Sequence, residues 1–188
     1  YIIMGTIFVD NLEPQSGTSL TVGASGDTIT IPSGCTISNS GTASGFGGNN
    51  TPNFFANKTN DQTISSGTST KVEFNTEEFD SDSAFASDRF TVPSGQAGKY
   101  FFYTVCHFTG ASDQNYHIVE FFKNGSVAAR SVNRFAGTNS LSESLSLIFD
   151  LSVGDYMEVY VKQNSGSSKT LRGEASERKT YFVGFKLA

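Results

Sequence analysis

The run Lys99–Phe108 (KYFFYTVCHF) limits the possible folds of this chain more than any other stretch. It consists almost wholly of aromatic, β-branched and small residues, which favour a strand over a helix. Successive side chains of a strand point to opposite faces. One face of this strand carries Phe101, Tyr103 and Val105, and the other carries Tyr100, Phe102, Cys106 and Phe108. One apolar face can pack on a second sheet, but the other needs a partner chain, because otherwise it leaves a large exposed patch. The sequence therefore predicts a β-sandwich that works as an oligomer.

Short extended runs separated by turn residues continue along residues 51–188. Asn124-Gly125 stands between two such runs and predicts a type I′ hairpin, since both central residues of that turn need positive φ. The polar stretches 58–69 and 76–88 are predicted to be loops. The pattern predicts an all-β fold, an antiparallel jelly-roll β-sandwich. The predicted strands are 53–56, 70–74, 90–92, 99–108, 116–123, 126–132, 141–151, 156–162 and 180–187.

Residues 1–50 differ from the rest of the chain in composition and in the pattern of their apolar residues. After a predicted short strand at Thr6–Val9, Ser-Gly pairs begin at Ser16, Ser25, Ser33 and Ser40, and one or two aliphatic residues stand between successive pairs. Such rungs have too few apolar residues for a core of their own, but rungs stacked from several chains would bury a continuous stripe. A flexible Gly/Ser linker is the alternative, although it has no need of regularly placed aliphatic residues. We predict an attachment segment, a short β-rich stem or arm, at 1–50 and a jelly-roll domain at 51–188.

The composition argues against several classes of protein. The net charge is −5 and only 16% of the residues are charged, and no basic stripe with interleaved aromatics is visible, so we expect no nucleic-acid partner. No apolar run reaches the ~18–20 residues that span a bilayer, so we expect no membrane insertion. The first residues lack the features of a signal peptide, and Met4 is a candidate initiator. Cys35 and Cys106 are expected to be unpaired and buried.

The sequence contains no recognisable catalytic or metal-binding constellation. His107 and His117 are the only histidines, and the nucleophile elbow and the zinc-protease motif are absent. The acidic residues between 77 and 88 lack the spacing of an EF-hand loop. Pairs such as Glu143 with Glu158 could be glycosidase carboxylates only at a separation that the sequence does not establish. We therefore expect no enzyme activity, no catalytic residue, no metal and no cofactor.

Four short motifs in order resemble the C1q/TNF-like jelly roll over residues 52–188. They are F-x-V-P-x-G-x-x-G-x-Y-x-F from Phe90, F-x-K-N-G from Phe121, L-x-x-G-D-x-x-E-V-Y from Leu151, and F-x-G-F from Phe182. The resemblance implies a compact homotrimer with aromatic strands around the three-fold axis. No Gly-X-Y repeat is present, so complement-type functions do not carry over. The residues expected at the trimer interface are Tyr100, Phe101, Phe102, Tyr103, Phe182 and Phe185.

Residues 4–37 resemble instead the start of structural proteins of tailed bacteriophages, in which such repeats form short trimeric stems ahead of a knob. This resemblance implies that the segment docks onto a virus particle. The residues expected to make that contact are Ile7, Phe8, Val9, Leu12, Leu20, Val22, Ile29 and Ile31.

These features together predict a non-enzymatic, homotrimeric structural protein on the surface of a phage virion, either a capsid-decorating (cement) protein or a short fibre. Its expected partners are other virion proteins, namely the major capsid protein or a tail component. The first alternative is a tail-fibre knob that recognises host surface glycans through loops such as 76–88, 109–115 and 163–178. The second is a secreted C1q-like binding module, which the missing signal peptide disfavours.

Overall fold

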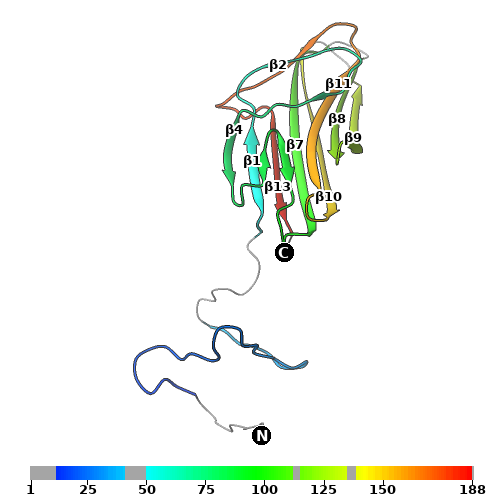
Figure 1. The fold of residues 1–188 in the computed structure, drawn as a ribbon. Coiled ribbons are helices and arrows are strands. Elements are labelled where there is room, and N and C mark those ends of the chain that lie inside the picture. Colours follow the sequence, from blue (N-terminus) through cyan, green and yellow to red (C-terminus); the bar gives the residue numbers. More distant parts are fainter. Residues whose placement is uncertain (1–11, 41–49, 112–114, 135–138, 188) are drawn as a thin grey trace. The chain divides into compact units, whose positions relative to one another are not determined.

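A computed structural model describes residues 12–40, 50–111, 115–134 and 139–187 of the chain (Figure 1). The chain forms two separate units, Tyr1–Ser44 and Gly45–Ala188. The sequence places the boundary after residue 50, within a few residues of this division.

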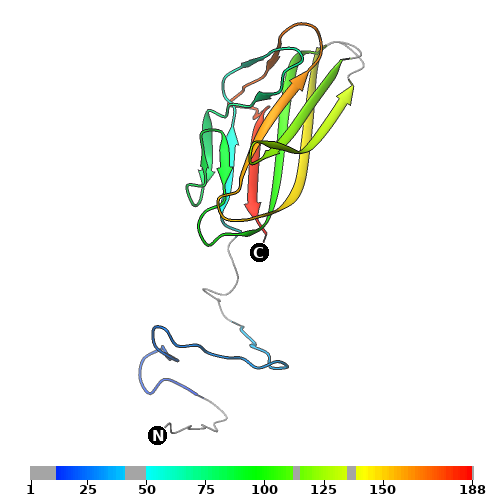
Figure 2. The same cartoon turned by 45° about the vertical axis from the view of Figure 1, so that its right-hand side comes forward.

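The second unit is a sandwich of two β-sheets whose named strand pairs are all antiparallel (Figures 1 and 2). In the first sheet the order is β4-β1-β13-β7-β10, and β12 and β2 continue beside the far end of β7. In the second sheet the order is β5-β6-β11-β8-β9, and β3 also pairs with β11. This arrangement confirms the predicted all-β jelly-roll sandwich. The strands of the first sheet are β1 (Asn53–Asn57), β2 (Gln62–Ile64), β4 (Thr76–Asp80), β7 (Gly98–Ala111), β10 (Asn139–Leu151), β12 (Lys169–Leu171) and β13 (Tyr181–Lys186). Those of the second are β3 (Thr70–Lys71), β5 (Phe85–Ala86), β6 (Arg89–Thr91), β8 (Tyr116–Lys123), β9 (Ser126–Arg134) and β11 (Tyr156–Gln163).

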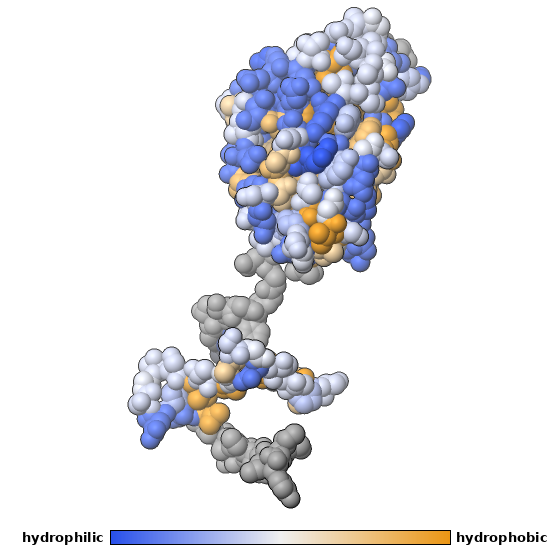
Figure 3. Space-filling model, viewed as in Figure 1, coloured by the Kyte–Doolittle hydropathy of each residue, from blue (hydrophilic) through white to orange (hydrophobic). Residues whose placement is uncertain are grey.

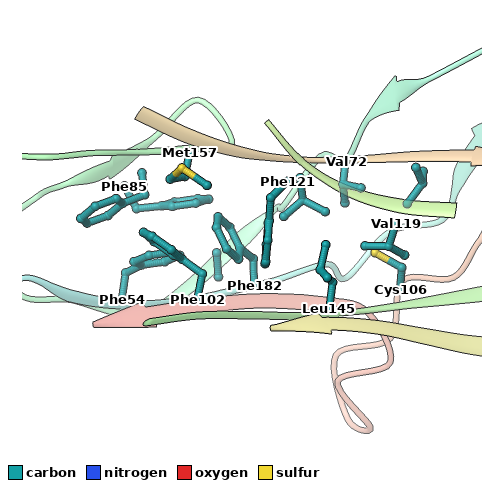
Figure 4. Packing of buried hydrophobic residues seen from close by; sticks show 14 of the residues in the cluster. Phe54, Val72, Phe85, Phe102, Cys106, Val119, Phe121, Leu145, Met157 and Phe182 are labelled. Carbon is teal, nitrogen blue, oxygen red and sulfur yellow. The ribbon is translucent and has the colours of Figure 1, made fainter. Parts of the chain in front are cut away.

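The core between the sheets is dominated by phenylalanine rings (Figure 4). Phe102 of β7 lies at its centre, with its ring centroid 5.7 Å from that of Phe182 and 5.4 Å from that of Phe90. Gly184 of β13 makes room for these rings, because a Cβ atom there would stand 2.5 Å from Cδ1 of Phe102. The alternation predicted for β7 is confirmed, since its even-numbered residues from 100 to 108 are buried and its odd-numbered ones are partly exposed.

The hairpin predicted at Asn124-Gly125 is also confirmed. These residues connect β8 to β9 and have φ of 52° and 77°, as a type I′ turn requires. The side-chain amide of Asn124 donates a hydrogen bond to Asp155 Oδ1 over 2.7 Å, and its oxygen accepts one from the Tyr156 amide over 2.9 Å. The hairpin is thereby fixed to the turn that leads into β11.

Some short edge elements differ from the sequence-based expectation. The stretches predicted as loops contain β2, β4 and β5, and the predicted strand 70–74 is only Thr70–Lys71. These strands are two to five residues long and mostly polar. The hydrogen-bonding partners of β2, β3 and β4 are distant in sequence, so neither local composition nor alternation reveals these strands. The strand β5 pairs with the adjacent β6 but is only two residues long.

The N-terminal unit contains no strand within residues 12–40, so the prediction of a β-rich stem is wrong for that part of a single chain. A single copy offers no neighbouring strand for the rungs to pair with. The Ser-Gly pairs in this range form bends or turns, with Gly17, Gly26 and Gly34 at φ of 74°, 94° and 87°. Aliphatic side chains between them lie at the surface of this unit (Figure 3). Cys35 is exposed here, contrary to expectation, whereas Cys106 is buried.

Candidate functional site

The outer face of the first sheet, which points away from the second sheet, is the candidate site. Residues directly opposite one another in an antiparallel pair lie on the same face. Phe101 of β7 lies between Phe185 of β13 and Ile148 of β10, and Val183 of β13 lies between Tyr103 and Phe55. The apolar residues of this outer face are Phe55, Phe79, Phe101, Tyr103, Val105, Ile148, Tyr181, Val183 and Phe185.

The aromatic rings of the outer face form contacts across four neighbouring strands. The ring centroids of Phe101 and Phe185 are 5.4 Å apart, and those of Tyr103 and Tyr181 are 5.8 Å apart. Phe55 lies 5.5 Å from Tyr181 and 6.1 Å from Phe79, which extends the cluster to the edge strand β4. Burial, together with the neighbouring Tyr103 hydroxyl, raises the pKa of Tyr181 to about 12, so the Tyr181 phenol stays neutral and fits an apolar contact surface.

The two edges of the outer face differ in shape. At the β4 edge an open hollow of about 460 Å³ is lined by Phe79, Val183, Gly184 and Phe185, with Asn50 and Asn53 at its polar part. At the opposite edge Ile148 of β10 is 54% exposed.

A single histidine lies on the outer face. His107 Nδ1 is 2.8 Å from Ser142 Oγ of the neighbouring strand β10. Burial lowers the pKa of His107, and the charges of Lys179 and Arg172 lower it further. A serine beside a histidine is one element of a nucleophilic site, but such a site also needs a third group that orients the base. Among the described residues no carboxylate accepts a hydrogen bond from the His107 ring, so the His107–Ser142 pair supplies a polar contact within an apolar surface.

The structure corrects half of the predicted trimer interface. Tyr100, Phe102 and Phe182 are fully buried in the protomer core, so the prediction is wrong for these three residues. Phe101, Tyr103 and Phe185 lie on the outer face, where a partner copy can reach them. The sequence-based list omitted Phe55, Phe79, Val105, Ile148, Tyr181 and Val183. The signal for Tyr181 and Val183 was present, since they alternate with the same parity as Phe185.

The residues predicted to dock onto a particle lie in the N-terminal unit. Ile7, Phe8 and Val9 fall outside the described residues. The other five are between 46% and 60% exposed and therefore form no core of their own. These five are Leu12, Leu20, Val22, Ile29 and Ile31.

Among the described residues no group of three or more His, Cys, Asp or Glu side chains is placed to hold a metal ion. The same part of the chain has no helix that is long and apolar enough to cross a membrane.

Comparison with solved structures identifies the fold as that of the C1q/TNF-like jelly roll. The globular domain of the zebrafish complement 1qA protein superposes with a TM-score of 0.51 at 17% identity, over 73% of this chain and 98% of that one. Murine APRIL superposes with a TM-score of 0.52 at 17% identity, over 72% and 98% of the two chains. At this identity the likeness concerns the fold alone. No protein-family description and no curated protein matches the sequence.

Proposed function

We propose that three copies of this chain assemble through the outer face of the first sheet into a non-enzymatic binding and display module. The observation that carries the proposal is the aromatic outer face, which the second sheet of the same protomer leaves uncovered. Fully burying one large apolar side chain contributes about 1.5–3 kcal/mol. Nine such side chains, although already partly buried, give association a strong apolar driving force.

The hollow and the protruding edge of the outer face can contact one another between copies. A ring brings two different patches together at every contact. The hollow beside Phe79 and the protruding Ile148 are two such patches on opposite edges of one face. The choice of three copies rests on the resemblance to C1q/TNF-like domains, which implies trimers.

We infer further that the N-terminal unit attaches the trimer to a phage virion as a capsid-decorating protein or short fibre. Its exposed aliphatic residues recur between glycine turns and lack a core, so they are suited to pack against another surface. The resemblance of residues 4–37 to phage structural proteins supports the choice of a virion as that surface. The jelly roll would then face outward.

The oligomeric state tests the first part of the proposal. Three copies of the 20.2 kDa chain should give a mass of 60.6 kDa by light scattering at micromolar concentration. Val183→Asp places a charge in the outer face and should yield a folded monomer or an aggregate. Val132→Asp is the matched control, because Val132 is exposed on the second sheet, and it should leave the trimer intact. A monodisperse monomer of the parent chain would refute the assembly.

Removal of the N-terminal unit tests the attachment. A protein lacking residues 4–45 should remain a soluble trimer but no longer co-sediment with virions. If the shortened protein still decorates particles, the docking assignment is wrong. Electron microscopy of the intact particle would separate a position on the capsid from one on the tail.

A further inference from the structure

The outer face of the second sheet gathers basic and aromatic side chains from strands that are far apart in sequence. Tyr160 of β11 lies between Lys71 of β3 and Glu120 of β8, and Glu120 lies opposite Arg130 of β9. The charged and aromatic residues of this face are Lys71, Arg89, Tyr116, Glu120, Phe122, Arg130, Arg134, Tyr156, Glu158, Tyr160 and Lys162. No basic stripe is visible in the sequence because these cations come from four separate strands.

The charge of this face has the opposite sign to that of the whole chain. Its five cations, namely Lys71, Arg89, Arg130, Arg134 and Lys162, stand against two carboxylates, Glu120 and Glu158, which leaves three positive charges in excess. The chain as a whole carries −5, so the rest of the protein carries −8. An acidic ligand is therefore repelled by most of the molecule and attracted to this face.

The arginines of this face are held in place before any ligand arrives. Glu158 Oε1 accepts hydrogen bonds from Arg89 Nε over 3.0 Å and Nη2 over 2.8 Å, and it pairs with Lys71 Nζ at 2.9 Å. The Arg89 guanidinium also lies 3.8 Å from the ring centroid of Tyr156. Arg89 Nη1 takes no part in the ion pair with Glu158. Fixing the side chain in advance lowers the entropy cost of binding.

Glu120 of β8 holds an arginine of β9 in the way that Glu158 holds Arg89. Arg130 Nη2 lies 3.2 Å from Glu120 Oε1, and the Ser69 hydroxyl donates to Glu120 Oε2 over 2.9 Å. The Arg130 side chain is 54% exposed, whereas that of Glu120 is 3% exposed. Arg134 lies 4.5 Å from the ring centroid of Tyr116. The glutamates thus lie beneath the surface, and the guanidinium groups are what a ligand meets.

The spacing of the cations indicates a polymer rather than a small anion. They extend from β6 across β11 and β8 to β9, which is three strand spacings or ~14 Å. A single small anion would need donors that converge on one point, whereas a chain of repeated negative charges can contact all of them.

The aromatic rings argue for a polysaccharide over single-stranded nucleic acid. Binding of single strands relies on bases that stack on free ring faces. Here the rings of Phe122 and Tyr160 stack on one another at 3.9 Å, and arginines cover Tyr116 and Tyr156. Hydroxyl and guanidinium groups at the surface suit a ligand that is rich in hydroxyls and carboxylates or sulfates.

We propose that the outer face of the second sheet binds an acidic polysaccharide across β6, β11, β8 and β9. The site is independent of the trimer interface, because it lies on the other sheet. A trimer would present three such sites, and their combined avidity would exceed the affinity of one.

The test uses heparin as a sulfated probe and polygalacturonate as a carboxylated probe, at physiological salt, with the full chain. Arg134→Gln combined with Lys162→Gln removes two cations that form no ion pair with Glu120 or Glu158. The apparent Kd for the probe should rise about tenfold, which corresponds to ~1.4 kcal/mol. Lys99→Gln combined with Lys169→Gln removes the same charge from the first sheet and should change Kd less than twofold. Thermal unfolding checks that both variants fold.

Three results would overturn the proposal. They are the absence of binding of the parent chain to both probes, equal weakening in the two double variants, and tighter binding of single-stranded DNA than of either polysaccharide. Light scattering on the same samples reports the trimer separately. A monomer that binds the probes would refute the proposed trimer but support the polysaccharide site. A trimer that binds neither probe would support the assembly but refute the site.

Discussion

Phe101 and Phe102 are adjacent in β7, yet the structure gives them opposite roles. The Phe102 side chain is fully buried and contacts the rings of Phe54, Phe90 and Phe182 in the protomer core. Phe101 is partly exposed on the outer face, where its ring packs on Phe185. Replacing each by alanine removes the same atoms from the two sides of one strand, so each variant is the matched control of the other.

The expected magnitudes follow from burial. Phe102→Ala deletes a ring that touches core residues from both sheets, and truncations of this kind destabilise a protein by about 3–5 kcal/mol. The loss is the same in a monomer and in a trimer. Phe101→Ala should cost the protomer roughly 1 kcal/mol or less, because its ring is already partly in solvent. Its effect should appear at the interface, where each of the three copies loses the burial of one ring.

Two measurements separate the outcomes. Urea unfolding at low protein concentration should show a large fall in the unfolding free energy for Phe102→Ala and a small one for Phe101→Ala. Light scattering over a dilution series should show the trimer dissociating at higher concentration for Phe101→Ala. If Phe101→Ala lowers the unfolding free energy of the monomer as much as Phe102→Ala does, the assignment of faces is refuted. Unchanged dissociation of the trimer would show that this face is not the interface.

Three further perturbations probe particular residues. Gly184→Ala should destabilise the fold by about 1–3 kcal/mol in urea unfolding, because the added Cβ would overlap the Phe102 ring; unchanged stability would contradict the tight packing of β13. Gly125→Ala should cost about 1 kcal/mol because φ there is +77°, which a residue with a Cβ atom adopts only with strain; unchanged stability would count against the type I′ turn. His117 is fully buried, and burial lowers its pKa below 6.5, so the unfolded state binds more protons and stability should fall as the pH drops through about 6.5. His117→Gln should reduce that loss in unfolding measurements at about pH 7 and about pH 5, and an identical loss would exclude His117 as its source.

The architecture could be predicted from the sequence because most strands of the sandwich have a recognisable local pattern of apolar and polar residues. Alternation in Tyr156–Lys162 placed Met157, Val159 and Val161 together, and all three are buried. Asn124-Gly125 located a hairpin because few residue pairs tolerate positive φ twice in succession. In β7, by contrast, alternation separated the two faces but did not say which one faces the core. Both faces carry large rings, so hydrophobicity does not distinguish them, and the interface list mixed residues from both.

Features that depend on pairing between distant strands were not predictable. Glu158 stands at a position that alternation assigns to solvent, yet its side chain is only 4% exposed, because Lys71 and Arg89 cover it from other strands. The excess of positive charge on the second sheet has the same origin. The hollow at the β4 edge is lined in part by Phe79, and Phe79 lies in a stretch whose acidic composition predicts a loop.

The two apolar faces of β7 have a consequence for how the chain tolerates insertions and deletions. Shifting the register of a strand by one residue moves every side chain to the opposite face of the sheet. In most strands such a shift would expose apolar side chains and bury charged ones. In β7 the slipped strand would still present rings on both sides. The correct frame depends instead on small groups, since Thr104 and Cys106 occupy inward positions where the slipped strand would place Tyr103 and Val105. Gain or loss of one codon in this stretch would therefore exchange the surface proposed to join copies with the surface that forms the core of one copy.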